Sequence, residues 1–338
     1  MNISTRWIMS LVSAGAIAGC ASAPTVEVPD TEVAARMRLD LNYLASPLLM
    51  GRLTGTPGND SAAAYIARRY AQLGLQPIFG SASCPDTSGC QKSFLEPFRV
   101  PAGRVNELDV RIRDRTQNVG ALVRGTDSIL RNEYVVVGAH YDHLGLSSVY
   151  ALDSSAFRRV HLGADDNASG TVAVMELARR LAAYPARRSV LFANFSAEEL
   201  GLVGSGVFVH NIPVPIDEVI TMVNLDMVGR LRRDRLVLHT AGADNRFHQI
   251  VDSVEKIAPA ISFHLIWKPA NDEASDQLSF ADAHVPVFSP FTELHADYHR
   301  FTDVADRINF AGMEKVVDLT ERVIRAVADG DSRPALAP

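Results

Sequence analysis

The sequence lacks the features that mark nucleic-acid binding or a membrane-spanning chain. Its formal net charge is −6 at pH 7, and no stretch is rich in lysine and arginine. Because nucleic-acid-binding surfaces are basic, we expect no nucleic-acid partner. After the first twenty residues, no apolar segment is long enough to cross a bilayer. Cysteine is scarce as well, with only three residues in the chain.

What the chain does contain at its N-terminus is the pattern of an export signal. Arg6 precedes a short apolar stretch at residues 8–18, which runs into the sequence IAGC at residues 17–20. A positive start, a short apolar region and small residues before a cleavage point are typical of a secretory signal. One aliphatic residue, two small ones and a cysteine also resemble the bacterial lipobox. This implies a signal peptide over residues 1–19 and lipidation of Cys20, the alternative being an ordinary signal peptide with a chance cysteine.

We therefore expect an exported bacterial lipoprotein, anchored in the outer membrane through Cys20 and facing the periplasm. Residues 20–30 would form the tether between the lipid and the folded part. The other two cysteines, Cys84 and Cys90, lie in the sequence CPDTSGC. Because an oxidising compartment allows disulfides and the pair makes an even count, we expect a disulfide between them.

The rest of the sequence is predicted to fold as one compact catalytic domain over residues 31–330, followed by a tail at 331–338. Helical periodicity comes first, at residues 31–45 and 61–73, and alternating segments at 94–124 suggest antiparallel strands. Buried strands and helices then alternate, with apolar runs at 134–139, 189–194, 219–225, 236–240, 261–266 and 285–289, and helical patterns at 168–183, 199–210 and 310–328. This alternation favours a three-layer α/β/α fold around a central mixed, mostly parallel twisted sheet.

Histidines and acids stand at equivalent places in this pattern, where strands end or helices begin. They are His140, Asp142, Asp165, Asp166, Glu198, Glu199 and Asp226, and a further cluster near the C-terminus holds His295, Tyr298 and His299. Ligands of open α/β sheets gather beyond the carboxyl ends of the strands, so we expect these side chains to converge. So many carboxylates would repel one another unless cations compensate them. Imidazole and carboxylate ligands suit two Zn²⁺ ions, and Mn²⁺ or Co²⁺ would also suit them.

Each of these residues has a structural alternative when it is taken alone. Asp165 and Asp166 could cap the helix that follows them, and Glu198 and Glu199 could be first-turn acids that complement a helix dipole. His140 could be an ordinary core histidine. The shared position at strand ends favours one common site over this set of coincidences.

Five motifs, in order along the chain, resemble the dizinc aminopeptidase family. They are GAHYDHLG, GADDNASG, FSAEELGLVGS, NLDMVG and HADYHRFTD, and GRLTGTPGND resembles the N-terminal region of the same family. The family includes bacterial leucyl aminopeptidases and aminopeptidase Y, and more distantly glutamate carboxypeptidase and the transferrin receptor ectodomain. The resemblance covers roughly residues 35–325 and implies a fold of the zinc-exopeptidase type.

The resemblance implies a set of metal ligands. His140 and Asp226 would bind one zinc ion, and Glu199 and His299 would bind the other. Asp166, the second acid of GADDNASG, would bridge both ions.

The resemblance also implies catalytic roles. Glu198 would be the general base that acts on a water bridging the two metal ions. Tyr298 would help to stabilise the tetrahedral oxyanion, and Asp142 would orient the ligand His140. His143 and His295 lie near these motifs, but the resemblance gives them no role.

The function that follows is a zinc-dependent exopeptidase, an aminopeptidase that hydrolyses N-terminal residues from peptide substrates. A carboxypeptidase or dipeptidase with the same site is one alternative, because the motifs build the hydrolytic site and not the substrate pocket. A glutaminyl cyclase-like transferase with a single zinc is another, against which the complete set of five ligands argues. A binding module that has lost its metals would show missing ligands, and none is missing here.

Overall fold

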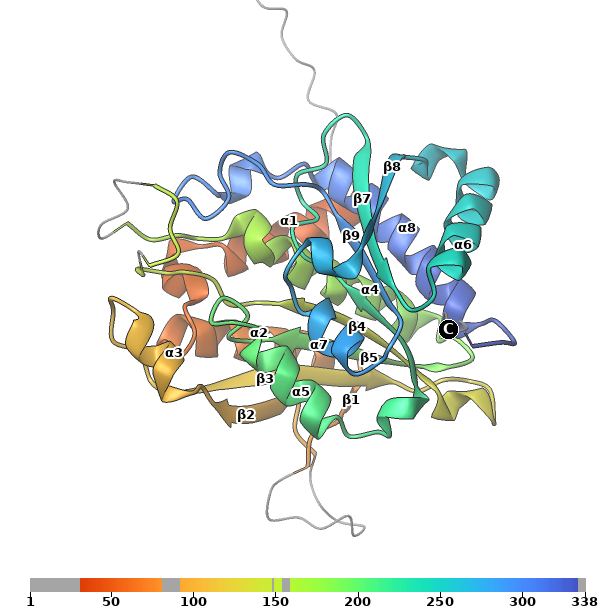
Figure 1. Cartoon of the computed structure of the whole chain (residues 1–338), viewed down its shortest axis with the longest axis horizontal. Coiled ribbons are helices and arrows are strands. Elements are labelled where there is room, and N and C mark those ends of the chain that lie inside the picture. The colour runs from red at the N-terminus through yellow and green to blue at the C-terminus, as the bar shows by residue number, and fades with distance from the viewer. Residues whose placement is uncertain (1–30, 81–91, 148, 154–158, 334–338) are drawn as a thin grey trace, which may run out of the picture.

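The computed structural model describes residues 31–80, 92–147, 149–153 and 159–333 (Figure 1). The predicted signal peptide and tether, the lipidation site Cys20 and the predicted disulfide between Cys84 and Cys90 all lie outside the described residues. Among the residues that are described, no helix is both long and apolar enough to span a membrane.

One twisted sheet of nine strands runs through the described part of the chain, in the order β1-β3-β5-β4-β6-β9-β7-β8, with β2 also paired to β3. The strands are β1 (Gln76–Pro77), β2 (Leu95–Arg99), β3 (Arg115–Val123), β4 (Tyr134–His140), β5 (Ser189–Phe195), β6 (Val219–Asn224), β7 (Arg235–Ala241), β8 (His264–Pro269) and β9 (Val287–Phe291). The central strands β5, β4, β6 and β9 pair in parallel, as do β7 and β8. The other pairings are antiparallel: β3 with β1, β2 and β5, and β7 with β9. The predicted mixed sheet is confirmed, and its parallel run lies at the centre.

Helices cover both faces of this sheet, which gives the three layers expected. They are α1 (Glu32–Leu44), α2 (Pro57–Gln72), α3 (Ala102–Glu107), α4 (Gly170–Ala183), α5 (Val203–Asn211), α6 (Asp244–Ile257), α7 (Gln277–Asp282) and α8 (Phe310–Ala328). One hydrophobic cluster joins a face of the sheet to α1, α2, α4, α6 and α8, and a second joins the other face to α5 and α7. Helices α5 and α7 lie in front of the strands in Figure 1.

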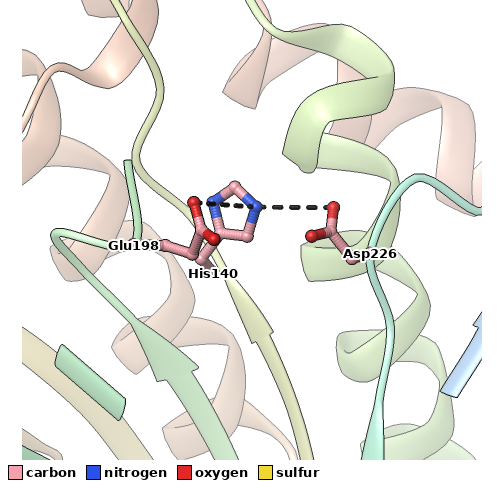
Figure 2. A group of neighbouring side chains, drawn as sticks. All are labelled: His140, Glu198 and Asp226. Carbon is pink, nitrogen blue, oxygen red and sulfur yellow. Dashed lines mark ion pairs between the residues drawn. The ribbon is translucent and has the colours of Figure 1, made fainter. Parts of the chain in front are cut away.

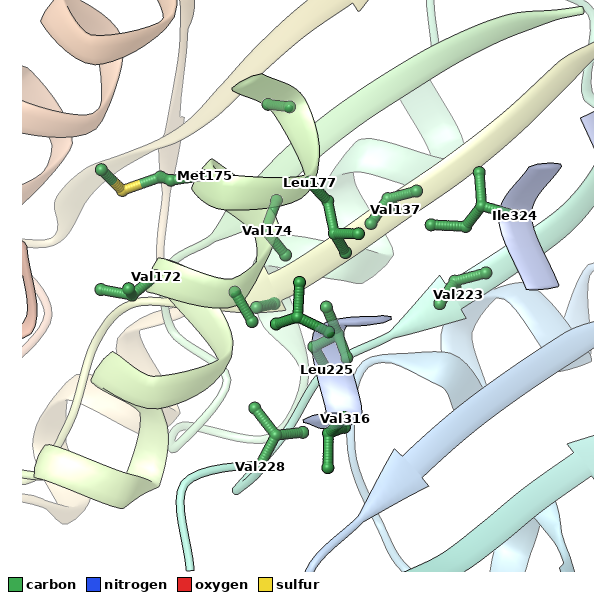
Figure 3. Packing of buried hydrophobic residues seen from close by; sticks show 14 of the residues in the cluster. Val137, Val172, Val174, Met175, Leu177, Val223, Leu225, Val228, Val316 and Ile324 are labelled. Atoms are coloured by element: carbon green, nitrogen blue, oxygen red, sulfur yellow. The ribbon is translucent and has the colours of Figure 1, made fainter. Parts of the chain in front are cut away.

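Alternate side chains of each central strand point to opposite faces of the sheet, so one strand contributes residues to both hydrophobic clusters. Along β4, Val135 and Val137 pack in the first cluster, whereas Val136 packs in the second. Alternate side chains of a strand point to opposite faces, so a strand buried on both sides reads as one continuous apolar run. Figure 3 shows Val137 of β4 and Val223 of β6 packed with Leu177 of α4 and with α8.

Helix starts follow local capping chemistry. The hydroxyl of Thr31 accepts a hydrogen bond from the backbone N–H of Ala34 at 3.0 Å and caps α1. The predicted start of the second helix at residue 61 is wrong, because α2 already begins at Pro57. Thr56 caps that helix and Pro57 fills its first turn, a combination that favours a helix start.

Other predicted boundaries differ as well: the strand predicted at 285–289 is β9, at Val287–Phe291, and the helix predicted at 168–183 is α4, which begins at Gly170. A further difference concerns the site. The helix predicted over residues 199–210 is α5, which begins only at Val203, because Gly201 and Leu202 have positive φ angles of 96° and 59°. Glu198 and Glu199 therefore precede the helix and are not acids of its first turn. The strand predicted at 261–266 is β8, shifted towards the C-terminus because the chain makes a helical turn before it.

Candidate metal centre

The candidate site lies beyond the carboxyl ends of three adjacent parallel strands, as the sequence predicts. His140 is the last residue of β4, Glu198 and Glu199 lie in the turn after β5, and Asp226 lies just after β6. Because β4 sits between β5 and β6, residues from three separate motifs meet at one sheet edge. Asp166 reaches the same place from the turn that precedes α4.

The first group of donor atoms surrounds His140. Its Nε2 atom lies 3.4 Å from Oδ1 of Asp226 and 3.4 Å from Oδ1 of Asp166. Oε2 of Glu198 lies farther away, at 4.0 Å. Figure 2 shows the His140 ring between the carboxylates of Glu198 and Asp226. All of these side chains are largely buried.

The second group surrounds the other oxygen of Asp166. Nε2 of His299 lies 3.2 Å from Oδ2 of Asp166 and 3.3 Å from Oε2 of Glu199. Asp166 thus directs one oxygen towards each group. This arrangement places a single carboxylate between two sets of nitrogen and oxygen donors.

His143 is a member of this second group that the motifs leave without a role. Its Nδ1 atom lies 2.7 Å from Oε1 of Glu199, which is hydrogen-bonding distance, and 3.7 Å from Oδ2 of Asp166. Its ring meets that of His299 edge-to-face, with centroids 5.8 Å apart. His143 is fully buried and its Nε2 atom has no hydrogen-bond partner among the described residues. The sequence signal was its position in GAHYDHLG, one residue after Asp142.

The buried charges perturb one another strongly. Burial would lower the pKa of His140, but the surrounding carboxylates, Asp226 foremost, raise it well above its ordinary value. Burial would also lower the pKa of His299, yet Glu199 and its neighbours raise it to about 11. For Glu198, burial raises the pKa of the carboxyl well above the usual range. A cluster of this kind needs positive charge, which protons or divalent cations can supply.

The donor geometry fits zinc. Ligand atoms about 2.0–2.1 Å from a tetrahedral zinc ion lie about 3.3 Å from one another. The four shortest nitrogen–oxygen distances from His140 and His299 to the carboxylates are 3.2, 3.3, 3.4 and 3.4 Å. In addition, Oδ1 of Asp226 is buried and has no hydrogen-bond partner in the described residues. An orphaned carboxylate oxygen is costly unless a cation meets it.

Asp142 supports the first group of donor atoms through hydrogen bonds and contacts with His140. Its carboxylate is fully buried and accepts hydrogen bonds from the Thr54 hydroxyl at 2.8 Å and from the backbone N–H of Glu198 at 3.2 Å. Its Oδ1 atom lies 3.7 Å from Nδ1 of His140, whereas its backbone carbonyl oxygen is closer, at 3.2 Å. The backbone of Asp142 therefore orients His140 more directly than the carboxylate does.

Asp226 has a support of its own. The hydroxyl of Ser275 donates to Oδ2 of Asp226 at 2.7 Å and accepts from the Asn224 side chain at 3.0 Å. Asn224 also donates to the buried Gln277 at 2.8 Å. These contacts leave Oδ1 of Asp226 as the oxygen that faces His140, and sequence reasoning gave no signal for Ser275.

A second support holds the turn that carries Asp166. The carboxylate of Asp303 accepts hydrogen bonds from the backbone N–H groups of Asp165 and Asp166, at distances of 2.9 to 3.1 Å. Asp165 accepts from the backbone N–H of Gly229 at 2.7 Å and lies 3.1 Å from Nε2 of His295. Asp165 thus links two loops, and His295 acquires a positioning role that the motif alone did not reveal.

Arg52 is the largest polar side chain buried beneath the site. It is completely buried and donates hydrogen bonds of 2.7 to 2.8 Å to four backbone carbonyls, those of Leu44, Tyr141, Leu162 and Gly163. Burial lowers the pKa of its guanidinium to about 10. One side chain thereby ties the segment after α1 to the turns on either side of the donor atoms, a role that the motif GRLTGTPGND did not disclose.

Tyr298 stands at the edge of the second group. Its ring stacks on that of His299, with centroids 3.9 Å apart and planes 22° apart. Burial, with the nearby carboxylates, raises the pKa of the phenol well above its usual value, so the hydroxyl stays protonated. A protonated phenol can donate a hydrogen bond to an anionic oxygen.

Comparisons with known proteins find similarity to peptidases. The sequence profile of peptidase family M28 matches residues 118–324. The chain is 26% identical over 219 residues to the aminopeptidase YwaD of Bacillus subtilis, which covers 63% of this chain and 45% of that protein. The chain spans between 20% and 45% of the length of the curated relatives it matches.

Solved structures share the fold. A zinc aminopeptidase from Bacillus subtilis superposes with a TM-score of 0.67 at 16% identity, covering 89% of this chain and 97% of that one. A Zn-dependent exopeptidase from Parabacteroides distasonis superposes with a TM-score of 0.68 at 15% identity, covering 90% and 99%. The match of the family profile over more than half of the sequence, on a fold that gathers the family's motifs at one sheet edge, shows that this chain belongs to peptidase family M28.

Proposed function

We propose that this protein is a zinc-dependent aminopeptidase that removes N-terminal residues from peptides. The observation that carries the proposal is the position of Asp166, whose two oxygens face two separate groups of nitrogen and oxygen donors. A bridging carboxylate of this kind is what a centre of two metal ions requires.

The residues would divide as the resemblance implies. His140 and Asp226 would hold one zinc ion, Glu199 and His299 the other, and Asp166 would bridge them. The bound ions would supply Lewis acidity, which lowers the pKa of water and polarises a carbonyl group.

Glu198 is the residue best placed to move protons. It stands apart from the closest contacts of either group, since its Oε2 atom lies 4.0 Å from His140. Burial raises the pKa of its carboxyl, which makes the carboxylate a stronger base. Its carboxylate would take the proton of the attacking water and deliver it to the leaving amine. The hydrogen bond from the backbone N–H of Glu198 to Asp142 holds the turn that carries this side chain.

Tyr298 would act on the scissile carbonyl of the substrate, and not on the attacking water. Its hydroxyl would donate a hydrogen bond to the oxygen that becomes negative when water adds to the scissile carbonyl. Stacking on His299 fixes the direction of the ring. His143, hydrogen-bonded to Glu199, would orient that carboxylate.

The choice of aminopeptidase rests on the names of the relatives and needs a direct test. Purified protein would be analysed for bound zinc and then given one peptide in three forms: free, N-acetylated, and C-terminally amidated. We expect about two zinc ions per chain, turnover of the free and amidated forms, and none of the acetylated form. Turnover that survives acetylation but not amidation would assign a carboxypeptidase. If the peptide is a dipeptide, and if N-acetylation and C-terminal amidation each abolish turnover, the protein would be assigned as a dipeptidase.

We further propose that the protein is exported and anchored to the outer membrane, facing the periplasm, by a lipid on Cys20. The support is the sequence IAGC after a short apolar segment. Cys20→Ser should move the protein from the membrane fraction to the soluble periplasmic fraction. A wild-type protein that is already soluble and carries no acyl group by mass spectrometry would contradict the anchor.

A further inference from the structure

A surface groove of about 420 Å³ lies on strands β7, β8 and β9. Val237, Ile266 and Phe291 form its apolar wall. Val237 and Phe291 pack in one cluster with Met227, the residue that directly follows the ligand Asp226, and with Tyr298. The apolar wall of the groove therefore packs against the chain neighbours of two residues of the candidate metal centre.

The charges in this groove do not balance. Lys268 is paired with Asp272 at 2.6 Å, and Arg235 is paired with Glu293 at 2.9 Å. The remaining acid, Glu273, makes no side-chain hydrogen bond or ion pair with any residue that the structure describes, although it also lines the groove and is half-buried. One carboxyl group without an ion-pair partner among the described residues thus remains.

His239, the other titratable group of the groove, does not change this balance. It is almost completely buried, and burial lowers its pKa to about 4, so it is neutral at neutral pH. The groove therefore combines apolar walls with one carboxyl group, that of Glu273, which no cation among the described residues pairs.

Glu273 is also held close to the reaction centre. Its backbone carbonyl accepts a hydrogen bond of 2.8 Å from Gln277, and Ser275, in the same turn, donates to the ligand Asp226. Burial, and after it the negative charges of Asp226, Asp272 and Asp166, raise the pKa of the Glu273 carboxyl to about 7. The short, hydrogen-bonded turn links the backbone of Glu273 to the ligand Asp226 through Ser275.

From these observations we infer that the groove receives the side chain of the substrate's N-terminal residue and that Glu273 selects a lysine or arginine there. This inference rests on the proposed aminopeptidase function. The methylene groups of such a side chain would pack on Val237, Ile266 and Phe291, as long cationic side chains do on apolar surfaces. Its cationic end would form a charge-assisted hydrogen bond with Glu273.

Three chromogenic substrates test this: the p-nitroanilides of lysine, of norleucine and of glutamate. Norleucine has an unbranched aliphatic side chain like that of lysine, but without the ammonium group. We expect wild-type kcat/KM to be highest for the lysyl compound and lowest for the glutamyl one. Glu273→Gln should lower the lysyl-to-norleucyl ratio of kcat/KM about tenfold, with the norleucyl value nearly unchanged. Glu273→Asp should restore part of the ratio.

Glu218→Gln is the matched control, because Glu218 pairs with Arg333 and lies outside this groove. Its ratio should equal that of the wild type. An unchanged ratio in Glu273→Gln would overturn the inference while leaving the aminopeptidase function intact. An equal loss on lysyl and norleucyl substrates would also overturn it, since Glu273 would then bind the substrate's α-ammonium group. Failure of wild-type protein to cleave any of the three compounds would instead count against the proposed function.

Discussion

Glu198 and Glu199 are neighbours in the chain, yet their carboxylates belong to different groups of donor atoms. Oε2 of Glu198 lies 4.0 Å from Nε2 of His140, whereas Glu199 lies 2.7 Å from His143 and 3.3 Å from His299. Both residues lie in the turn between the end of β5 at Phe195 and the start of α5 at Val203. In this turn their side chains point to different donor groups. Two adjacent acids can therefore take two tasks, one as a ligand and one as a base.

This division predicts different effects of the same substitution at the two positions. Glu198→Gln should keep both zinc ions and near-normal KM, while kcat falls by about 10²–10⁴-fold, the range typical of a lost general base. Glu199→Gln should lower the zinc content, because an amide is a poorer ligand than a carboxylate. Metal analysis and steady-state kinetics of both variants measure these effects. Zinc loss confined to the Glu198 variant would reverse the two assignments.

Ser275 should tune metal affinity without touching substrate. Its hydroxyl donates to Oδ2 of Asp226, so Ser275→Ala would free that carboxylate to rotate away from His140. We expect zinc affinity to fall about 10–100-fold, as is usual for the loss of a hydrogen bond behind a ligand. Competition with a zinc chelator measures the change. Ser253→Ala, on the exposed part of α6, is the control and should bind zinc like the wild type.

Arg52 should be critical for stability. Arg52→Met would remove a donor from four backbone carbonyls, of which that of Gly163 still accepts from the backbone N–H of Ala168. Because each unsatisfied buried group costs about 1–3 kcal/mol, we expect the free energy of unfolding to fall by at least about 3 kcal/mol. Urea denaturation measures this. Arg99→Met removes an exposed pair with Asp114 and should change stability little. Similar losses in both variants would contradict a special role for Arg52.

Two helical glycines should respond in opposite directions to alanine. A Cβ atom on Gly170, the first residue of α4, would lie 2.0 Å from the backbone carbonyl oxygen of Leu225, next to the ligand Asp226. Gly170→Ala should therefore destabilise the fold by about 1–3 kcal/mol and reduce zinc binding. Gly206, inside α5, has open space at that position. Gly206→Ala should stabilise the protein by about 0.5–1 kcal/mol in thermal or urea unfolding.

Much of the fold could be predicted because the signals are local. The buried strands β4, β5 and β6 appear as continuous apolar runs, and α8 occupies the predicted residues 310–328. The start of α5 could not be predicted, because it depends on the conformation of Gly201 and Leu202 in a turn shaped by the site. The start of α2 could have been predicted from the sequence TPGND, because a capping threonine followed by a proline favours a helix start despite the loop-like composition.

The sequence by itself determined which residues are brought to the sheet edge, because a buried parallel strand delivers its last residues to a fixed place. That is why His140, Glu198, Glu199 and Asp226 could be named from their motifs. Only the tertiary structure decided how they are held there. Arg52, Ser275, Asp303 and His295 act through contacts between segments far apart in the chain. Such contacts depend on side-chain direction and loop conformation, which the period of a strand or helix does not specify.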